Sequence, residues 1–366
     1  MTATRDAGTT AHARLRSLDG LRGVAILLVV GAHAASAALD PGGGGLVSAV
    51  DRPLGQLGVT VFFVLSGYLI TGILTREQDR TGTVSIRAFY LRRTLRIWPA
   101  LYVFLGAMGV LALVGVVAIS GTEMLAAATY VYNYVPSADS WWIGHTWSLA
   151  VEEQYYLLWP LALLLLTRRR AAWVAVGVVV LSPALRLGTV LVVPTDLEGQ
   201  VPFYFHTRAD ALALGSLLAL APSTFPRAWT FLVARARRPS TTVTAVVLLL
   251  AHVAASVWLG IPYELAVGYS LTAACAAVVL LAATPDGSPL VQRALAARPL
   301  VLAGLVSFSW YLWQQVFLTP LNTTWSGVFP LNVLCSLLLA VLSYRLVEKT
   351  FLRLKPGARK AERVAR

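Results

Sequence analysis

The chain has 366 residues, of which 57% are hydrophobic and only 13% are charged, and its mean hydropathy is +0.69. Soluble globular proteins usually have about a quarter of their residues charged, so this composition excludes an ordinary soluble domain and indicates a membrane protein. The formal net charge of +13 does not indicate nucleic-acid binding, because the basic residues form short clusters between apolar runs and no recognition motif accompanies them.

Apolar runs of nearly the length that spans a bilayer recur from one end of the chain to the other. They predict an all-α fold, a polytopic membrane bundle of about ten transmembrane helices in one integral domain. The expected spans are 23–39, 57–75, 98–119, 147–166, 171–193, 208–221, 242–260, 265–283, 300–320 and 330–347. The run 122–134 is short and semi-polar, and we expect an interfacial or re-entrant segment there.

Basic residues occupy alternate connections between these spans. They gather in the N-terminal segment, 76–96, 168–170, 227–238, 293–298 and the tail from Arg345, whereas the other connections carry almost none, with Arg52 as the exception. Because Lys and Arg collect on the cytoplasmic side, both termini are predicted to be cytoplasmic. The predicted divisions are a disordered N-terminus at 1–15, a transmembrane domain at 16–354 and a basic tail at 355–366.

The first apolar run begins the stretch "RSLDGLRGVAILLVVGAHA" at 16–34 and contains an ionisable residue, His33. We expect this run to be the retained first span rather than a cleaved signal peptide, because the later spans need it for their topology. An ionisable side chain at bilayer depth costs about 2.5 kcal/mol or more, so it needs a partner or a function. Arg22 lies eleven residues earlier on the same helical face, about 16 Å away along the axis. The alternative is a neutral histidine that makes one hydrogen bond between helices.

Two further stretches combine charge with apolar sequence. In "GHTWSLAVEEQYYLLWP" at 144–160, Ser148, Glu152 and Tyr156 recur every four residues and share one helical face, with Glu153 turned about 100° away. In "FYLRRTLRIWP" at 89–99, Arg93 and Arg96 are neighbours on a helix and suited to paired hydrogen bonds with phosphate. The alternatives are glutamates solvated at the headgroup level, and arginines that follow the positive-inside pattern or attract anionic lipid.

Taken together and in order, the motifs of this chain resemble acyltransferase family 3, bacterial membrane enzymes that O-acylate sugars and related hydroxyl compounds. The motifs are "LDGLRGVAILLVVGAH" (18–33), "FFVLSGYLIT" (62–71), "FYLRRTLRIWPALY" (89–102), "HTWSLAVEEQYYLLWP" (145–160), "TRADALALGSLLA" (207–219) and "VSFSWYLWQQ" (306–315). They extend over nearly the whole chain. The resemblance implies a multi-pass enzyme of the bacterial cytoplasmic membrane, consistent with the ten-helix prediction.

The resemblance also implies functions for single residues. His33 matches the histidine essential for transfer and Arg22 its partner in the same motif, and Arg93 and Arg96 match the pair that contacts the acyl donor. Ser148, Glu152 and Tyr156 match a serine-glutamate-tyrosine motif, and Asp19, Arg208 and Asp210 match further motif positions. We expect catalysis by His33, Arg22 and Glu152, and substrate binding by Arg93, Arg96, Ser148, Tyr156, Asp19, Arg208 and Asp210. Ser66 and Gly67 match further motif positions. One position departs from the pattern, because Gln314 stands where many relatives have histidine after the Leu312-Trp313 pair. Many relatives also continue into a soluble hydrolase-like domain, so we expect this chain to act alone or with a separate partner.

The predicted chemistry is transfer of an acyl group, expected to be acetyl, to an alcohol with formation of an ester, and His33 is the expected general base. We expect Glu152 to orient the imidazole and stabilise its charged form. The expected donor is acyl-CoA, whose phosphates are anions, with no bound cofactor or metal; Cys275 and Cys335 lie in apolar runs and offer neither a disulfide framework nor a metal site. The expected acceptor is a hydroxyl of a cell-envelope glycan or lipid-linked sugar, and the alternatives are a secreted macrolide or, in another class, a proton-coupled transporter.

Overall fold

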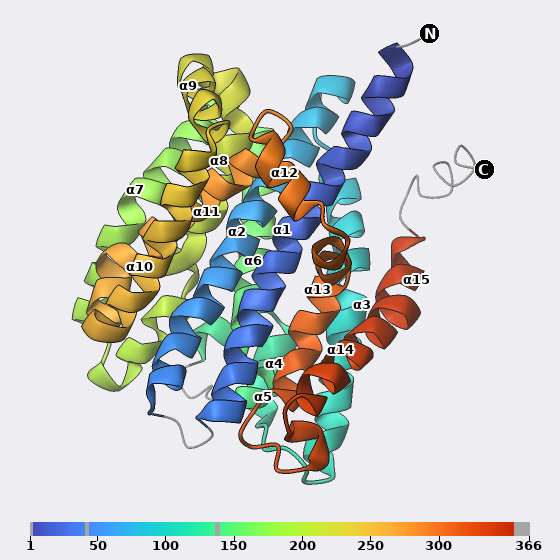
Figure 1. Ribbon diagram of the computed structural model, residues 1–366, viewed down its shortest axis with the longest axis vertical. Coiled ribbons are helices and arrows are strands. Elements are labelled where there is room, and N and C mark those ends of the chain that lie inside the picture. Colours follow the sequence, from blue (N-terminus) through green and yellow to red (C-terminus); the bar gives the residue numbers. More distant parts are fainter. Residues whose placement is uncertain (1–2, 41–43, 136–139, 355–366) are drawn as a thin grey trace.

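The protein is described here by a computed structural model that covers residues 3–40, 44–135 and 140–354. In those ranges the regular structure is helical, which confirms the all-α class. Figure 1 shows the long helices running side by side along the longest axis of the molecule. They are α1 (Ala3–Leu39), α2 (Leu46–Thr81), α3 (Ile86–Leu113), α6 (Thr146–Leu165), α7 (Arg168–Val192), α8 (Phe205–Thr224), α10 (Pro239–Tyr263), α11 (Tyr269–Ala283), α13 (Arg298–Phe317) and α14 (Leu331–Ser343).

Shorter elements connect the long helices. They are α4 (Gly121–Ala128), α5 (Trp141–Gly144), α9 (Pro226–Ala236), α12 (Pro289–Leu295) and α15 (Lys349–Leu352), the 3-10 helices η1 (Tyr132–Tyr134), η2 (Thr195–Phe203) and η4 (Trp325–Gly327), and the π-helices η3 (Glu264–Gly268) and η5 (Tyr344–Glu348). With 8 residues, α4 is about 12 Å long, far less than the roughly 30 Å of a bilayer core. The prediction that 122–134 is not a full span is therefore confirmed.

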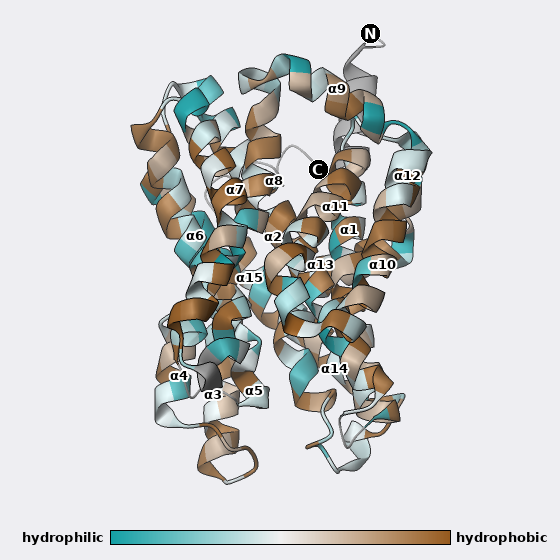
Figure 2. Cartoon of the chain, turned by 90° about the vertical axis from the view of Figure 1, so that its left-hand side faces the viewer, coloured by the Kyte–Doolittle hydropathy of each residue, from teal (hydrophilic) through white to brown (hydrophobic). Residues whose placement is uncertain are grey.

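Seven helical stretches of the described chain are long and apolar enough to cross a membrane. They are Arg16–Leu39, Leu46–Thr81, Ile86–Leu113, Arg168–Val192, Pro239–Ala283, Arg298–Phe317 and Leu331–Leu352. The 45-residue stretch contains α10, η3 and α11, and is interrupted at Gly260, whose φ of 65° is a left-handed conformation that glycine adopts without steric cost. Figure 2 shows hydrophobic residues along most of the long helices. The structure thus supports a multi-pass membrane protein, and the count of about ten stays a prediction.

The second long helix begins earlier than the sequence indicates. The segment 40–56 was expected to be a connection, but α2 already begins at Leu46. The Asp40 carboxylate explains this start, because it accepts hydrogen bonds from the backbone N–H groups of Gly45 (2.8 Å) and Ser48 (3.2 Å), which the first helical turn leaves unpaired. Hydrogen bonds from Ser48, first from its side chain, hold the pKa of Asp40 below its usual range. The early start places Asp51 and Arg52 on a helix.

The centre of the bundle is formed by α1, which packs against α2 and α13, and by α2, which also packs against α8. Glycines allow the backbones of α2 and α8 to approach closely. A Cβ atom at Gly67 would lie 1.9 Å from the Leu212 carbonyl oxygen, and one at Gly215 would lie 1.9 Å from the Val64 carbonyl oxygen. Small residues are the usual solution for close helix packing within a membrane. This close contact explains why residue 67 of the motif is a glycine.

The N-terminal part of α1 lies at the same end of the bundle as α9, whereas α4 and α5 lie toward the opposite end (Figure 1). The tail at 355–366 and part of the glycine-rich segment 41–45 fall outside the described residues. The helix α1 begins at Ala3, and its side chains are described from Arg16 onward. The disorder expected for 1–15 and the cytoplasmic position of the termini stay predictions.

Candidate active site

A cavity of about 310 Å³ lies among α1, α2, α3, α6 and α13. We call it the arginine cavity, because four of its lining residues are arginines. Its polar lining consists of Arg22, Ser66, Arg92, Arg93, Arg96, Ser148, Glu152, Tyr156, Ser307 and Tyr311, and its other walls are aromatic and aliphatic side chains such as Phe62, Phe63, Leu69, Phe89 and Phe308. The structure therefore brings six of the predicted site residues together: Arg22, Arg93, Arg96, Ser148, Glu152 and Tyr156.

The arginines of this cavity are held by neighbouring aromatic and acidic groups. The Arg93 guanidinium lies over the Tyr156 ring, 4.4 Å from the ring centroid, in cation–π geometry. Arg92 forms an ion pair with Glu77 at 2.8 Å, and Glu152 accepts a hydrogen bond from the Ser66 hydroxyl at 2.8 Å. Four cations against one carboxylate in the lining leave the cavity positively charged. Such a surface suits an anion, and guanidinium groups bind phosphate oxygens especially well.

A second cavity of about 320 Å³ lies farther along α1, and we call it the histidine cavity. Its polar lining consists of His33, Asp51, Arg52, Gln56, Asn133, Ser140, His145, Gln200 and Gln315, and its aromatic lining of Tyr132, Trp141, Trp147, Phe203 and Tyr311. Arg22 and His33 therefore face two different cavities from one helix, separated by about 16 Å along its axis. The stripe that joins them in the sequence is a real feature of α1.

His33 contacts residues from three other segments. Its Nδ1 atom lies 2.8 Å from Oε1 of Gln314 on α13, and its Nε2 atom lies 3.9 Å from Oδ1 of Asp51 on α2. The imidazole also makes an edge-to-face contact with Trp141 at a centroid distance of 5.2 Å. The side chain retains 16% of its exposure, so a molecule in the cavity can reach the ring.

Several polar atoms on the wall of the histidine cavity are buried and have no hydrogen-bond partner among the described residues. They are Oδ1 of Asp51, Oε1 of Gln56 and Nε2 of His145. Buried polar groups normally find partners, so unmet groups at a cavity wall are typical of a site that binds a polar ligand. The aromatic lining adds flat surfaces on which a sugar ring can pack.

His145 is a second histidine at this cavity, immediately before α6. Its Nδ1 atom donates to Oε1 of Gln315 at 2.5 Å. Burial lowers the pKa of His145 to about 4, which makes its imidazole a poor proton acceptor at neutral pH. His33 is therefore the better placed of the two for general-base chemistry.

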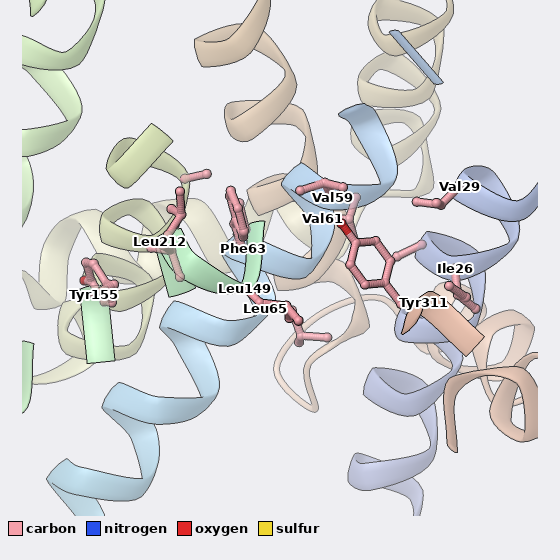
Figure 3. Packing of buried hydrophobic residues seen from close by; sticks show 14 of the residues in the cluster. Ile26, Val29, Val59, Val61, Phe63, Leu65, Leu149, Tyr155, Leu212 and Tyr311 are labelled. Atoms are coloured by element: carbon pink, nitrogen blue, oxygen red, sulfur yellow. The ribbon is translucent and has the colours of Figure 1, made fainter. Parts of the chain in front are cut away.

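A thin wall separates the two cavities, since Val59 and Tyr311 line both of them. Figure 3 shows the Tyr311 ring between Val59 of α2 and the α1 residues Ile26 and Val29. The Tyr311 hydroxyl lies 2.6 Å from the Ser148 hydroxyl and donates to the His145 carbonyl oxygen at 3.1 Å. Ser148 therefore holds the wall in place from the side of the arginine cavity.

Three residues predicted to bind substrate line neither cavity: Asp19, Arg208 and Asp210. Asp210 forms a buried ion pair with Arg186 of α7. Arg208 donates to the Thr60 hydroxyl at 3.0 Å and lies 4.3 Å from the centroid of the Tyr269 ring. These contacts join α8 to α2, α7 and α11, so the structure gives Arg208 and Asp210 packing contacts. Asp19 lies in the electrostatic neighbourhood of Arg22 and Arg96, beside the arginine cavity.

The expected contact between Glu152 and His33 is not formed. Glu152 belongs to the arginine cavity, where it accepts from Ser66, and the carboxylate beside His33 is that of Asp51. Sequence spacing places residues on one helix but does not say which helices touch. Asp51 and the wall residue Tyr311 were missed for this reason. The signal that could have found Asp51 is its neighbour Arg52, the one basic residue in a set of connections that otherwise contain no Lys or Arg.

The fold and the cavities define a class of protein, a multi-pass helix bundle with two polar-lined cavities between its helices. The family model described as an acyltransferase domain, acyltransferase 3, matches residues 15–344, and the chain belongs to this family. No solved structure matches the chain.

Curated relatives carry more specific names. The chain is 26% identical to the peptidoglycan O-acetyltransferase OatA of Listeria monocytogenes, over 93% of this chain and 56% of that protein. It is 30% identical to a Bacillus subtilis protein provisionally named as a peptidoglycan O-acetyltransferase, over 93% of this chain and 55% of that protein. A Staphylococcus aureus protein provisionally named as an O-acetyltransferase is 27% identical over 94% of this chain and 59% of its own length. The chain thus spans little more than half the length of these relatives.

Proposed function

We propose that this O-acyltransferase moves an acetyl group from acetyl-CoA to a hydroxyl of a cell-envelope glycan. The observation that carries the proposal is the pair of cavities: one positively charged, one containing an accessible imidazole, and both lined by Tyr311 and Val59. Two such cavities with a shared wall suit an enzyme that joins an anionic donor to a neutral alcohol. The names of the relatives support peptidoglycan or a related glycan as the acceptor.

The donor is assigned to the arginine cavity. Arg22, Arg93 and Arg96 bind the phosphates of the coenzyme, since charge-assisted hydrogen bonds from guanidinium groups are among the strongest contacts to phosphate. The apolar walls, including Phe62 and Phe63, receive the pantetheine arm. Tyr156 holds Arg93 in place through its ring, and Glu152 limits the repulsion among the arginines.

The acceptor is assigned to the histidine cavity. As the acceptor oxygen attacks the thioester carbonyl, its proton passes to Nε2 of His33 and a new C–O bond forms. The C–S bond then breaks and the coenzyme leaves as a thiolate, which takes up the proton from Nε2 of His33 and thereby restores the neutral base. General-base catalysis of this kind contributes about 10²- to 10⁴-fold to the rate.

We also propose the orientation of the bundle. The connections rich in arginine, 76–96, 168–170 and 227–238, follow or precede the ends of α2, α6 and α8 on the side of α9 and of the N-terminal part of α1 (Figure 1). That side faces the cytoplasm under the positive-inside rule. The 20-residue helices α6 and α8 also cross the membrane, and Pro239–Ala283 crosses twice, which gives ten spans. The arginine cavity then faces the compartment that contains acetyl-CoA.

The test is transfer of labelled acetyl from acetyl-CoA by the purified full chain in lipid nanodiscs. The acceptor probe is a set of soluble glycan fragments released from peptidoglycan by a muramidase. We expect labelled ester that mild alkali removes. Accumulation of glycan fragments inside proteoliposomes without esterification would instead support transport and contradict the proposal, and transfer to a macrolide probe alone would contradict the glycan acceptor.

A further inference from the structure

We propose that Gln314 and Asp51 are positioning residues for His33. Gln314 holds the neutral imidazole in the tautomer with its proton on Nδ1, and Asp51 stabilises the positive charge that develops when Nε2 takes a proton. This inference rests on the proposed function, because it assigns the groups that prepare His33 to act as a base.

The contact with Gln314 selects the tautomer. Oε1 of the amide faces Nδ1 of His33 at 2.8 Å, and an amide oxygen can only accept a hydrogen bond, so Nδ1 carries the proton. Gln314 is completely buried, and water therefore does not compete for this bond. Which ring nitrogen of a histidine is free is set by the hydrogen bond that the other one makes. The lone pair of the neutral ring is consequently on Nε2.

The free nitrogen faces open space in the histidine cavity. The α2 residue on that side is Gly55, where even a Cβ atom would remain 3.8 Å from Nε2. Gly55 and Asp51 are four residues apart on α2 and lie on the same helical face. An acceptor hydroxyl can therefore approach Nε2 without first displacing a side chain at this position.

Asp51 supplies the charge that the neutral amide lacks. Its Oδ1 atom lies 3.9 Å from Nε2, too far for a hydrogen bond and close enough for an ion pair. The Asp51 side chain retains only 15% of its exposure, so screening by solvent is weaker than at a free surface. In a Ser-His-Asp triad, one aspartate both orients the imidazole and stabilises the imidazolium. Here two residues share these functions: the Gln314 amide orients the ring from Nδ1, and the Asp51 carboxylate stabilises the imidazolium from the other side.

The direct test is nitrogen NMR of the full chain labelled with ¹⁵N-histidine, because the ring shifts report which nitrogen carries the proton. The chain has only five histidines, and His33→Gln identifies the signals of His33 by their loss. We expect the Nδ1–H tautomer in the unmodified protein and in Gln314→Glu, which keeps an acceptor oxygen. Gln314→Leu should lose this tautomer preference. The matched control is Gln292→Leu on α12, whose amide donates to the Thr284 carbonyl oxygen at 2.7 Å, outside both cavities.

Kinetics with labelled acetyl-CoA and the muramidase fragments complete the test. We expect Gln314→Leu to lower kcat by about 10- to 100-fold, and Asp51→Asn by about tenfold, with the KM for acetyl-CoA unchanged, and Gln314→Glu to restore most of the activity lost in Gln314→Leu. An Nε2–H tautomer in the unmodified protein would overturn the proposal even if a variant failed to fold. An unchanged tautomer and kcat in folded Gln314→Leu would also overturn it. Failure of the proposed function is distinguishable, because it appears as full activity of His33→Ala or as no acetyl transfer by the unmodified protein.

Discussion

The two cavities are nearly equal in volume, about 310 and 320 Å³, and differ in almost everything else. In the arginine cavity the charged groups already have neighbours: Arg92 has Glu77, and Arg93 has the Tyr156 ring. In the histidine cavity, buried oxygen and nitrogen atoms of Asp51 and His145 lack hydrogen-bond partners among the described residues. The arginine cavity also has one such atom, Oγ of Ser307, so the two cavities differ mainly in their charge and in the imidazole that only the second one contains.

The comparison also shows how one helix contributes to both compartments. Arg22 and His33 differ by eleven residues on α1, which is about three helical turns, so they keep one face but reach different depths. Substitutions in the two cavities should therefore separate binding of the donor from the chemical step. The following variants test that separation, from the largest expected effect to the smallest.

Removal of the base should have the largest effect. We expect His33→Ala to lower kcat for acetyl transfer by about 10²- to 10⁴-fold, because the substitution removes the imidazole that takes the acceptor proton. Binding of acetyl-CoA, measured by calorimetry, should stay within twofold of the unmodified protein. The control is His252→Ala, which removes a histidine of α10 that lines neither cavity. Full activity of folded His33→Ala would contradict the assignment of general-base catalysis to the histidine cavity.

Loss of the paired arginines should affect the donor alone. A hydrogen bond to a charged group contributes about 1.5–3 kcal/mol, so Arg93→Gln and Arg96→Gln should each raise the KM for acetyl-CoA by about 10- to 100-fold. The KM for the glycan fragments should not change. Arg169→Gln combined with Arg170→Gln is the matched control, since both side chains are exposed at the start of α7. An unchanged donor KM in the cavity variants would refute the docking site.

A substitution of Glu152 distinguishes the expected contact of this residue with His33 from its observed position in the arginine cavity. If it acts within the arginine cavity, Glu152→Gln should change the donor KM by about three- to tenfold, because the amide keeps an acceptor for Ser66 but loses the charge beside Arg93. Steady-state kinetics with acetyl-CoA measure this change. A fall in kcat as large as that of His33→Ala would show that Glu152 acts on the imidazole, whereas full activity would remove Glu152 from the mechanism.

Loss of the Tyr311 hydroxyl from the wall should have the smallest effect of these substitutions, and we expect it on the stability of the protein. Tyr311→Phe removes the hydroxyl that bonds Ser148 and the His145 carbonyl oxygen, at a cost of about 1 kcal/mol. We expect the Tm in detergent to fall by about 2 °C, as measured by intrinsic fluorescence during heating. Phe62→Leu, on the arginine-cavity side of the same wall, keeps these hydrogen bonds and serves for comparison. A higher Tm for Tyr311→Phe would contradict the structural importance of the hydroxyl.

Sequence patterns predicted the parts of this protein that depend on local spacing. Apolar runs predicted the all-α bundle and the short segment around α4. The spacing of four residues predicted the shared face of Ser148, Glu152 and Tyr156. They did not predict the partners of His33, because contacts among α1, α2 and α13 depend on how helices pack rather than on their periodicity. The start of α2 was missed as well, since it depends on one carboxylate, Asp40, that caps the helix from outside its own apolar run.

The wall made by Val59 and Tyr311 has a consequence for the membrane itself. If the two cavities merged, the bundle would contain a continuous passage through which ions could flow down their gradients. Under the proposed function, the wall of Val59 and Tyr311 therefore has to exclude ions while the acetyl thioester reaches His33. Transfer of a group as small as acetyl is thus compatible with a bundle that keeps ions from crossing the membrane.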